Sequence, residues 1–214
     1  MKLENIHSNY INSPLVEIPT DSGIVIEMQY YLKKMPFSID KCLLRKEVLD
    51  KLFQAKQYLP SGITFKIWDA YRPIELQKEI YYQYKDEIIK NFKLENISED
   101  QQNKIISKYV SYPNYDVKNA PLHTTGGAVD LTLVDIKTGK ELDMGCYFDE
   151  FSDRASTDYY EKNNLNNEAK KNRRILYNAM IRAGFTNLPN EFWHYDYGDN
   201  LWSFYTKKLF YMGE

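Results

Sequence analysis

The chain has 214 residues, of which 43% are hydrophobic and 27% are charged, and its formal net charge at pH 7 is -2. This length suits one sizeable core rather than two full domains, so we expect a single domain over residues 1–214. The near-neutral charge gives no electrostatic reason to expect binding to nucleic acid or to an anionic membrane.

The first residues, MKLENIHSNYINSPLVEI, are polar where a signal peptide needs an uninterrupted apolar stretch. No window approaches the roughly 18 consecutive apolar residues of a membrane span. The two cysteines, Cys42 and Cys146, lie far apart and do not form the pattern of a disulfide framework. These features predict a cytoplasmic, reduced protein that does not enter a membrane.

The apolar run at 22–28 predicts a first short strand. Residues 41–59 place apolar side chains at helical spacing, and Pro60-Ser61-Gly62 ends that helix. Residues 63–69, ITFKIWD, alternate as a strand does. The later predicted elements are a helix at 74–92 with Pro73 before it, a helix near 99–110, a turn at 135–139, an irregular loop at 141–160, a helix at 166–183 closed by Gly184, and a strand-like segment at 191–198. Helices and strands alternate irregularly, which favours the α+β class.

The stretch PLHTTGGAVDLTL, at 121–133, places Asp130 among apolar residues of a predicted strand. A desolvated carboxylate needs a partner or a metal. His123 precedes it, and Gly126 and Gly127 would let the backbone turn tightly between the two. The remaining histidines are His7, in a polar segment, and His194.

His123, Asp130 and His194 form a plausible ligand set for tetrahedral zinc, which would leave a fourth position for water. Glu191 could then act as the general base on that water. Glu191 and His194 have opposite parity on a regular strand, so we expect Glu191 at a bend before it. Arg72 would stabilise negative charge on a carbonyl oxygen under attack.

Each of these residues also has a plainer interpretation. His123 fits a turn, and Asp130 could accept a hydrogen bond from a backbone amide. The EFWH segment at 191–194 fits an aromatic strand with a glutamate at its edge. Arg72 could form a surface salt bridge, and Cys146 is better explained as a packed thiol than as a nucleophile.

In combination, three motifs in this order resemble the zinc D-alanyl-D-alanine peptidases, and most closely their VanX-type dipeptidase branch. They are Tyr71-Arg72-Pro73, the His123-x-x-Gly126-x-Ala128-x-Asp130 pattern, and Glu191-x-Trp193-His194. The resemblance covers roughly residues 24–205 and includes DMGxxFD at 143–149.

The resemblance implies a small hedgehog-like α+β domain with one zinc ion on a central antiparallel sheet flanked by helices. His123, Asp130 and His194 would bind the zinc, Glu191 would be the catalytic base, and Arg72 would stabilise the tetrahedral intermediate. The resemblance also implies two substrate contacts. Asp149 would receive the free ammonium of the dipeptide, and Tyr31 would be a pocket tyrosine.

The family usually has a serine where this chain has Pro121, and Leu122 stands where a small polar residue is common. The segment after the pocket tyrosine also differs, as Pro36-Phe37-Ser38-Ile39. The expected function is hydrolysis of D-Ala-D-Ala or a related D,D-dipeptide. The alternatives are a D,D-carboxypeptidase acting on peptidoglycan stems and a non-catalytic zinc module of the same fold.

Overall fold

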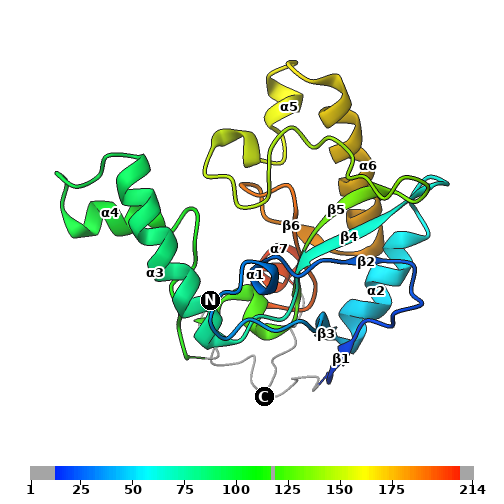
Figure 1. Cartoon of the computed structure of the whole chain (residues 1–214), viewed down its shortest axis with the longest axis horizontal. Coiled ribbons are helices and arrows are strands. Elements are labelled where there is room, and N and C mark those ends of the chain that lie inside the picture. Colours follow the sequence, from blue (N-terminus) through cyan, green and yellow to red (C-terminus); the bar gives the residue numbers. More distant parts are fainter. Residues whose placement is uncertain (1–12, 117–118, 208–214) are drawn as a thin grey trace.

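The structure, a computed structural model, describes residues 13–116 and 119–207, so His7 lies outside the described residues. Its elements in chain order are β1 (Leu15–Glu17), β2 (Val25–Ile26), α1 (Gln29–Leu32), β3 (Leu43–Arg45), α2 (Lys46–Lys56), β4 (Ile63–Asp69), α3 (Ile74–Asn91), α4 (Glu99–Ile106), β5 (Ala128–Asp135), α5 (Tyr159–Lys162), α6 (Asn167–Ala183), β6 (Thr186–Asn187), β7 (His194–Asp196) and α7 (Asn200–Thr206) (Figure 1). Short 3-10 turns cover Leu122–Thr125 and Asp153–Ala155. The predicted α+β class is confirmed.

The central sheet has five strands in the order β2-β4-β5-β7-β6, and β1 pairs with β3 separately. The expectation of an antiparallel sheet needs one correction. Strands β4, β5, β7 and β6 are antiparallel neighbours, but β2 runs parallel to β4. Between β2 and β4 the chain passes through α1, β3 and α2. This crossover returns the chain to the sheet in its original direction.

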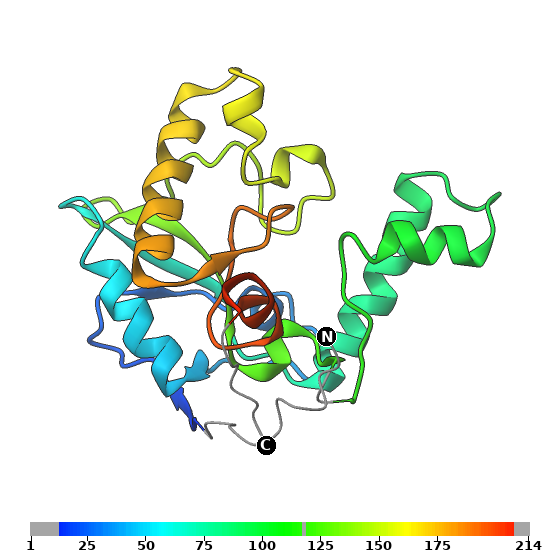
Figure 2. The ribbon, with the colours of Figure 1, turned by 180° about the vertical axis from the view of Figure 1, so that it is seen from behind.

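Helices α2 and α6 cover one side of the sheet, the side nearer the viewer in Figure 2. They bury Leu52 and Leu176 in the same apolar cluster as Phe65 of β4 and Leu131 and Leu133 of β5. Strand β5 is buried along almost its whole length. The strand that carries Asp130 is therefore held rigidly at the centre of the fold.

Helices α3 and α4 extend away from the body of the molecule, as both ribbon views show (Figures 1 and 2). They have an apolar core of their own, which includes Ile80, Ile88 and Ile106. Phe148 and Phe151, from the loop after β5, pack against this second core. The segment that leaves α4 returns to the body and forms one wall of the cavity described below.

The predicted boundaries differ from the structure at several places. The strand predicted at 22–28 is confined to Val25–Ile26. Residues 43–45 are strand β3 and not the start of α2, because they pair with β1. The helix predicted near 99–110 ends at Ile106. The strand predicted at 191–198 is confined to His194–Asp196. Gly184 closes α6 in the left-handed conformation, with a φ of 100°, as predicted.

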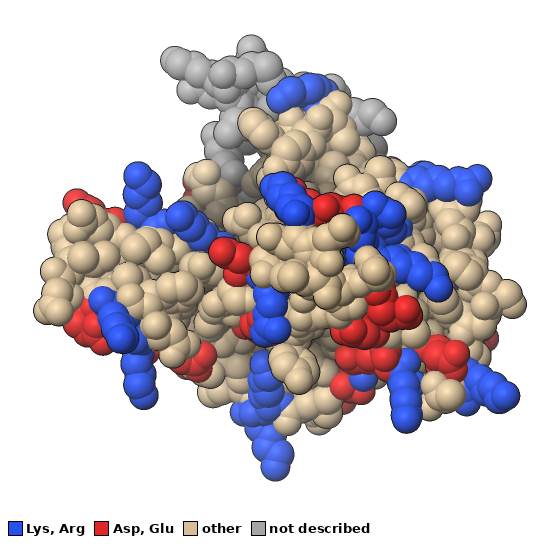
Figure 3. All heavy atoms as spheres, turned by 90° about the horizontal axis from the view of Figure 1, so that it is seen from above, with Lys and Arg blue, Asp and Glu red and all other residues tan. Residues whose placement is uncertain are grey.

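The surface of the described residues shows no dominant charge on the face in Figure 3, where basic and acidic side chains are interspersed. Within 13–116 and 119–207, no helix combines the length and the apolar character that crossing a membrane would require. Cys42 is a buried free thiol and Cys146 is a partly buried one.

Candidate active site

Three acidic or imidazole side chains lie in one row across the sheet. Asp130 of β5 stands directly opposite His194 of β7. Asp69, the last residue of β4, also pairs with Asp130, because the register shifts between Ile67 and Asp69. A bulge of this kind re-aims a side chain next to a functional site. Here it brings Asp69 into the row.

His123 reaches the row from the 3-10 turn before β5. Gly126 ends that turn with a φ of 74°, and a Cβ there would lie 2.5 Å from a methyl carbon of Leu15. Only glycine fits this position, which confirms the predicted tight turn between His123 and the strand. The His123 Nδ1 lies 2.8 Å from the carbonyl oxygen of Ala70, which follows Asp69.

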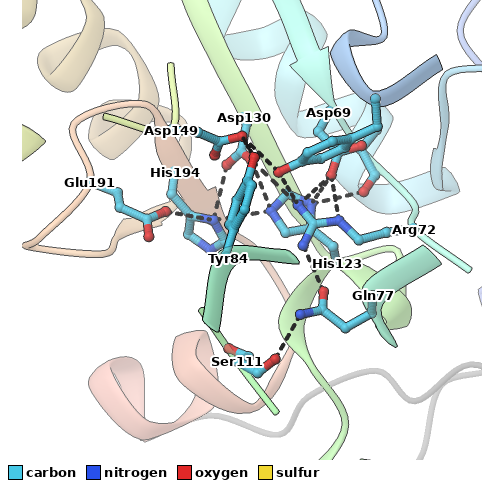
Figure 4. A network of polar contacts seen from close by, with 12 residues as sticks. Asp69, Arg72, Gln77, Tyr84, Ser111, His123, Asp130, Asp149, Glu191 and His194 are labelled. Carbon is cyan, nitrogen blue, oxygen red and sulfur yellow. Dashed lines mark hydrogen bonds and ion pairs between the residues drawn. The ribbon is translucent and has the colours of Figure 1, made fainter. Parts of the chain in front are cut away.

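The three expected metal ligands converge on one point (Figure 4). His123 Nε2 lies 3.2 Å from His194 Nδ1 and 3.2 Å from Asp130 Oδ2. His194 Nδ1 lies 3.0 Å from Asp130 Oδ1. Donor atoms placed about 2.0–2.1 Å from a tetrahedral zinc ion lie roughly 3.3 Å from one another. The spacing of the three side chains therefore fits a single metal ion.

The outer nitrogens of the two imidazoles have acceptors that set the tautomers. His123 Nδ1 faces the carbonyl of Ala70, and His194 Nε2 lies 2.8 Å from Asp196 Oδ1. When both outer nitrogens donate to these acceptors, the inner nitrogens carry lone pairs that face Asp130. Three converging acceptors need a shared cation, so the donor set fits a metal ion.

The charges around the cluster favour a cation as well. Burial would raise the pKa of the Asp130 carboxyl, but the two histidines outweigh burial and hold this pKa far below its usual range. Burial would lower the pKa of His194, but Asp196 and Asp130 outweigh burial and raise this pKa. All three ligand side chains are buried, so water cannot screen these interactions.

Glu191 lies beside the cluster and outside it. Its Oε2 is 3.9 Å from His194 Nδ1, which is too far for a hydrogen bond but leaves room for a bridging water. Glu191 precedes β7 in a turn, where its backbone N–H donates to the carbonyl of Leu188. The predicted bend is confirmed. Burial raises the pKa of Glu191 to about 8, although His194 opposes the shift.

Arg72 is a buried residue of the site and does not form a surface salt bridge. Its Nε donates to Asp69 Oδ2 at 2.9 Å, and its Nη2 lies 2.7 Å from the same oxygen. Asp69 Oδ2 is also 3.4 Å from His123 Nδ1. Asp69 therefore holds Arg72 and also contacts His123, and Arg72 Nη2 comes to lie 4.0 Å from Asp130 Oδ2.

Asp149 lies in the same network (Figure 4). Its Oδ2 accepts hydrogen bonds from Tyr84 at 2.6 Å and from Tyr30 at 3.0 Å, and Lys33 Nζ is 3.8 Å away. Burial raises the pKa of Asp149, while Tyr84 and Lys33 oppose that shift. Its backbone is left-handed, with a φ of 59°, a conformation that aspartate tolerates better than most residues.

Tyr31 does not lie with these residues. It is 47% exposed and is absent from the lining of the cavity, whereas Tyr30 is buried and lines it. The two tyrosines are consecutive residues of α1, so their side chains point in different directions. The structure therefore places Tyr30 in the position that the sequence indicated for Tyr31.

A cavity of about 390 Å³ joins these groups. Its lining includes the expected residues Arg72, His123, Asp130, Asp149, Glu191 and His194, together with Tyr30, Gln77 and Tyr84 from α1 and α3. Sequence reasoning missed Asp69, Gln77, Tyr30, Tyr84 and Asp196. One signal was available for Asp196. It follows His194 by two residues and so shares its face of the strand.

The chain is similar in sequence to known peptidases. The D-ala-D-ala dipeptidase family model matches residues 31–212. A D-alanyl-D-alanine dipeptidase of Synechocystis sp. is 33% identical over 178 residues, covering 75% of this chain and 71% of the relative. The dipeptidase of Escherichia coli strain K12 is 30% identical over 73% of this chain and 67% of its own length, and that of Enterococcus faecium is 27% identical over 74% and 75%. Among solved structures, VanYB in complex with D-Ala-D-Ala aligns with a TM-score of 0.45 at 19% identity, over 91% of this chain and 89% of that chain.

The family match covers most of the chain, and the relative from Synechocystis extends over about three quarters of it. Peptide hydrolysis is the activity in the family's description, and the cluster of His123, Asp130 and His194 has the donors that such an enzyme needs for a metal. The chain is a metallopeptidase and belongs to the D-ala-D-ala dipeptidase family.

Proposed function

We propose that the protein is a zinc dipeptidase that hydrolyses D-Ala-D-Ala or a closely related D,D-dipeptide. His123, Asp130 and His194 would hold one zinc ion per chain. The observation that carries this proposal is the convergence of the two inner imidazole nitrogens and the Asp130 carboxylate, with contacts of 3.0–3.2 Å, and the presence of an acceptor at each outer imidazole nitrogen. Imidazole nitrogen and carboxylate oxygen are preferred ligands of zinc.

Zinc supplies Lewis-acid chemistry, which polarises a peptide carbonyl and lets water ionise near neutral pH. The remaining steps fall to side chains of this chain. Glu191 has its carboxylate 3.9 Å from His194 Nδ1, within reach of a water at the cluster. It would take the proton of the attacking water and hold it. Glu191 would then pass that proton to the leaving amine.

Arg72 would stabilise the negative charge that develops on the carbonyl oxygen. Its guanidinium lines the cavity, and Asp69 holds one edge of it. A donor that is already oriented costs no reorganisation when charge develops. Because Asp69 also contacts His123, the geometry of the cation and that of the metal site depend on one buried carboxylate.

Asp149 would pair with the free ammonium of the dipeptide, with Tyr30 and Tyr84 orienting its carboxylate. Substrates with a blocked amine would lose this charge pair with Asp149. The site would therefore prefer dipeptides with a free amino group to longer chains. That preference agrees with the dipeptidase relatives and distinguishes this activity from that of a D,D-carboxypeptidase acting on peptidoglycan stems.

We further propose one catalytic domain that spans the chain, supported by the family match over residues 31–212. Limited proteolysis should release no stable fragment if this is correct. The cytoplasmic location stays a prediction, and fractionation of the native host cell tests it.

The test of function is metal analysis of the purified protein followed by steady-state hydrolysis of D-Ala-D-Ala, N-acetyl-D-Ala-D-Ala and L-Ala-L-Ala. We expect one zinc ion per chain and turnover of the free D,D-dipeptide well above that of the other two. Equal turnover of the acetylated form would show that the enzyme is not a dipeptidase. A protein that neither contains a metal nor gains activity from added zinc would contradict the whole proposal.

A further inference from the structure

Gln77 is a buried amide on an otherwise apolar helix face. It is 1% exposed and lies on the buried side of α3, together with Leu76, Ile80 and Tyr84. Both ends of its side chain are satisfied. Arg72 Nη1 donates to Gln77 Oε1 at 2.6 Å, and Gln77 Nε2 donates to the carbonyl of Ser111 at 2.7 Å. Gln77 thus links Arg72 to Ser111, in the segment after α4 that lines the cavity (Figure 4).

A guanidinium has five N–H donors in one plane. In Arg72, Nε donates to Asp69 Oδ2, and Nη2 lies 2.7 Å from the same oxygen and donates to the Tyr30 hydroxyl at 3.4 Å. One Nη1 donor goes to Gln77. Within 13–116 and 119–207, the second Nη1 donor has no hydrogen-bond acceptor. It is therefore available to a substrate oxygen.

The remaining donor sits on the nitrogen that Gln77 holds. Both N–H groups of Nη1 lie in the guanidinium plane at a fixed angle, so the bond to Gln77 sets the direction of the other one. Both contacts from Asp69 come from a single oxygen, Oδ2, about which the rigid guanidinium can still pivot, so the bond from Nη1 to Gln77 supplies the second fixed point. Removing Gln77 would free this edge to rotate within the cavity.

From this geometry we infer that Gln77 is a positioning residue. It directs the free N–H of Arg72 toward the carbonyl oxygen of the substrate and ties that direction to the cavity wall at Ser111. The inference rests on the role proposed for Arg72. Because the donor acts on charge that develops during the reaction, its misplacement should lower kcat and leave KM nearly unchanged.

The test compares full-length, zinc-loaded variants on D-Ala-D-Ala. Gln77→Met removes both hydrogen bonds at similar side-chain length. We expect it to lower kcat roughly tenfold with KM changed by less than about twofold, as for a displaced catalytic donor. Gln83→Met is the matched control. Gln83 is an exposed residue of the same helix, and its side-chain amide donates a hydrogen bond to Glu87. The kcat of Gln83→Met should therefore match that of the wild type.

A double-mutant cycle with Arg72→Ala separates positioning from a general structural role. If Gln77 acts through Arg72, Gln77→Met should cause no further loss of kcat once Arg72 is absent. Gln77→Glu keeps the acceptor for Nη1 and should recover most of the lost kcat. If Gln77→Met does not fold, Gln77→Asn takes its place, because it withdraws the amide from Nη1 by one methylene.

Two results would overturn the inference. One is a wild-type kcat in both Gln77→Met and Gln77→Asn, and the other is the same loss of kcat in the presence and absence of Arg72. Failure of the proposed function has a different signature. In that case the wild-type enzyme would not hydrolyse D-Ala-D-Ala, or Arg72→Ala would retain full activity.

Discussion

The ammonium subsite offers a sharp test, because a single charge can be removed with little change in shape. Asp149→Asn keeps an oxygen that can accept the hydrogen bonds of Tyr30 and Tyr84 and removes only the negative charge. The Asp149 side chain is 17% exposed, so an ammonium bound there would be largely shielded from water. The substitution therefore isolates the charge pair with the substrate.

The size of the effect follows from the surroundings of Asp149. Two unit charges about 4 Å apart interact by about 4 kcal/mol at an effective dielectric of 20 and by about 1 kcal/mol in water. Lys33 Nζ, at 3.8 Å, already neutralises part of the Asp149 charge. An intermediate value of about 2.7 kcal/mol corresponds to a loss of roughly 100-fold in kcat/KM for D-Ala-D-Ala.

The assay compares kcat/KM for D-Ala-D-Ala in the wild type, Asp149→Asn and the matched control Glu150→Gln. Glu150 is the next residue, pairs with Arg154 and does not line the cavity. The control should stay within about twofold of the wild type, because Glu150 lies outside the cavity and its ion pair with the half-exposed Arg154 contributes little. A loss below threefold for Asp149→Asn, or an equal loss for Glu150→Gln, would refute the assignment of the ammonium subsite to Asp149.

Three further predictions concern the base, the metal and the core. The Glu191→Gln variant should bind zinc normally and have a kcat lower by about 10³-fold, the size expected for a lost general base. Metal analysis and steady-state kinetics check this prediction. Near-normal turnover would show that Glu191 is not part of the mechanism. Zinc at about 1,000 times its Kd should stabilise the native state by about 4 kcal/mol and raise the Tm by roughly 10 °C. Thermal unfolding should show this shift in the wild type and not in His194→Ala, and an equal shift in both would place the metal elsewhere. Leu131→Ala, at a fully buried position of β5, should lower the free energy of unfolding by about 2–5 kcal/mol in urea titrations, and a loss below 1 kcal/mol would contradict the central role of this strand.

Much of the fold could be predicted from local patterns. Helix α3 and strand β4 were predicted almost to the residue, since helical spacing and strict alternation both persist there. Strands β1 and β3 and helix α7 were missed or merged into neighbouring elements. A strand of three residues carries too little periodicity to be recognised, and its existence depends on a partner that lies far away in the sequence.

In the candidate site, too, some residues could be predicted from the sequence and others could not. His123, Asp130, Glu191, His194 and Arg72 were all identified in advance, and the structure brings them into one cavity. The choice between Tyr30 and Tyr31 was not available from the sequence. Adjacent residues of a helix point about 100° apart, and which of them faces the cavity depends on how the helix docks.

What the sequence determined by itself was therefore the kind of chemistry. The residue types at these spacings indicate a metal, a base and a cation, because those functions require specific donor atoms. The tertiary structure alone decided which groups support them. The bulge in β4 brings Asp69 into line with Asp130, and the path of α3 brings Gln77 to Arg72. Both depend on the register and packing of segments that do not adjoin in the chain, and no local pattern of residues encodes such contacts.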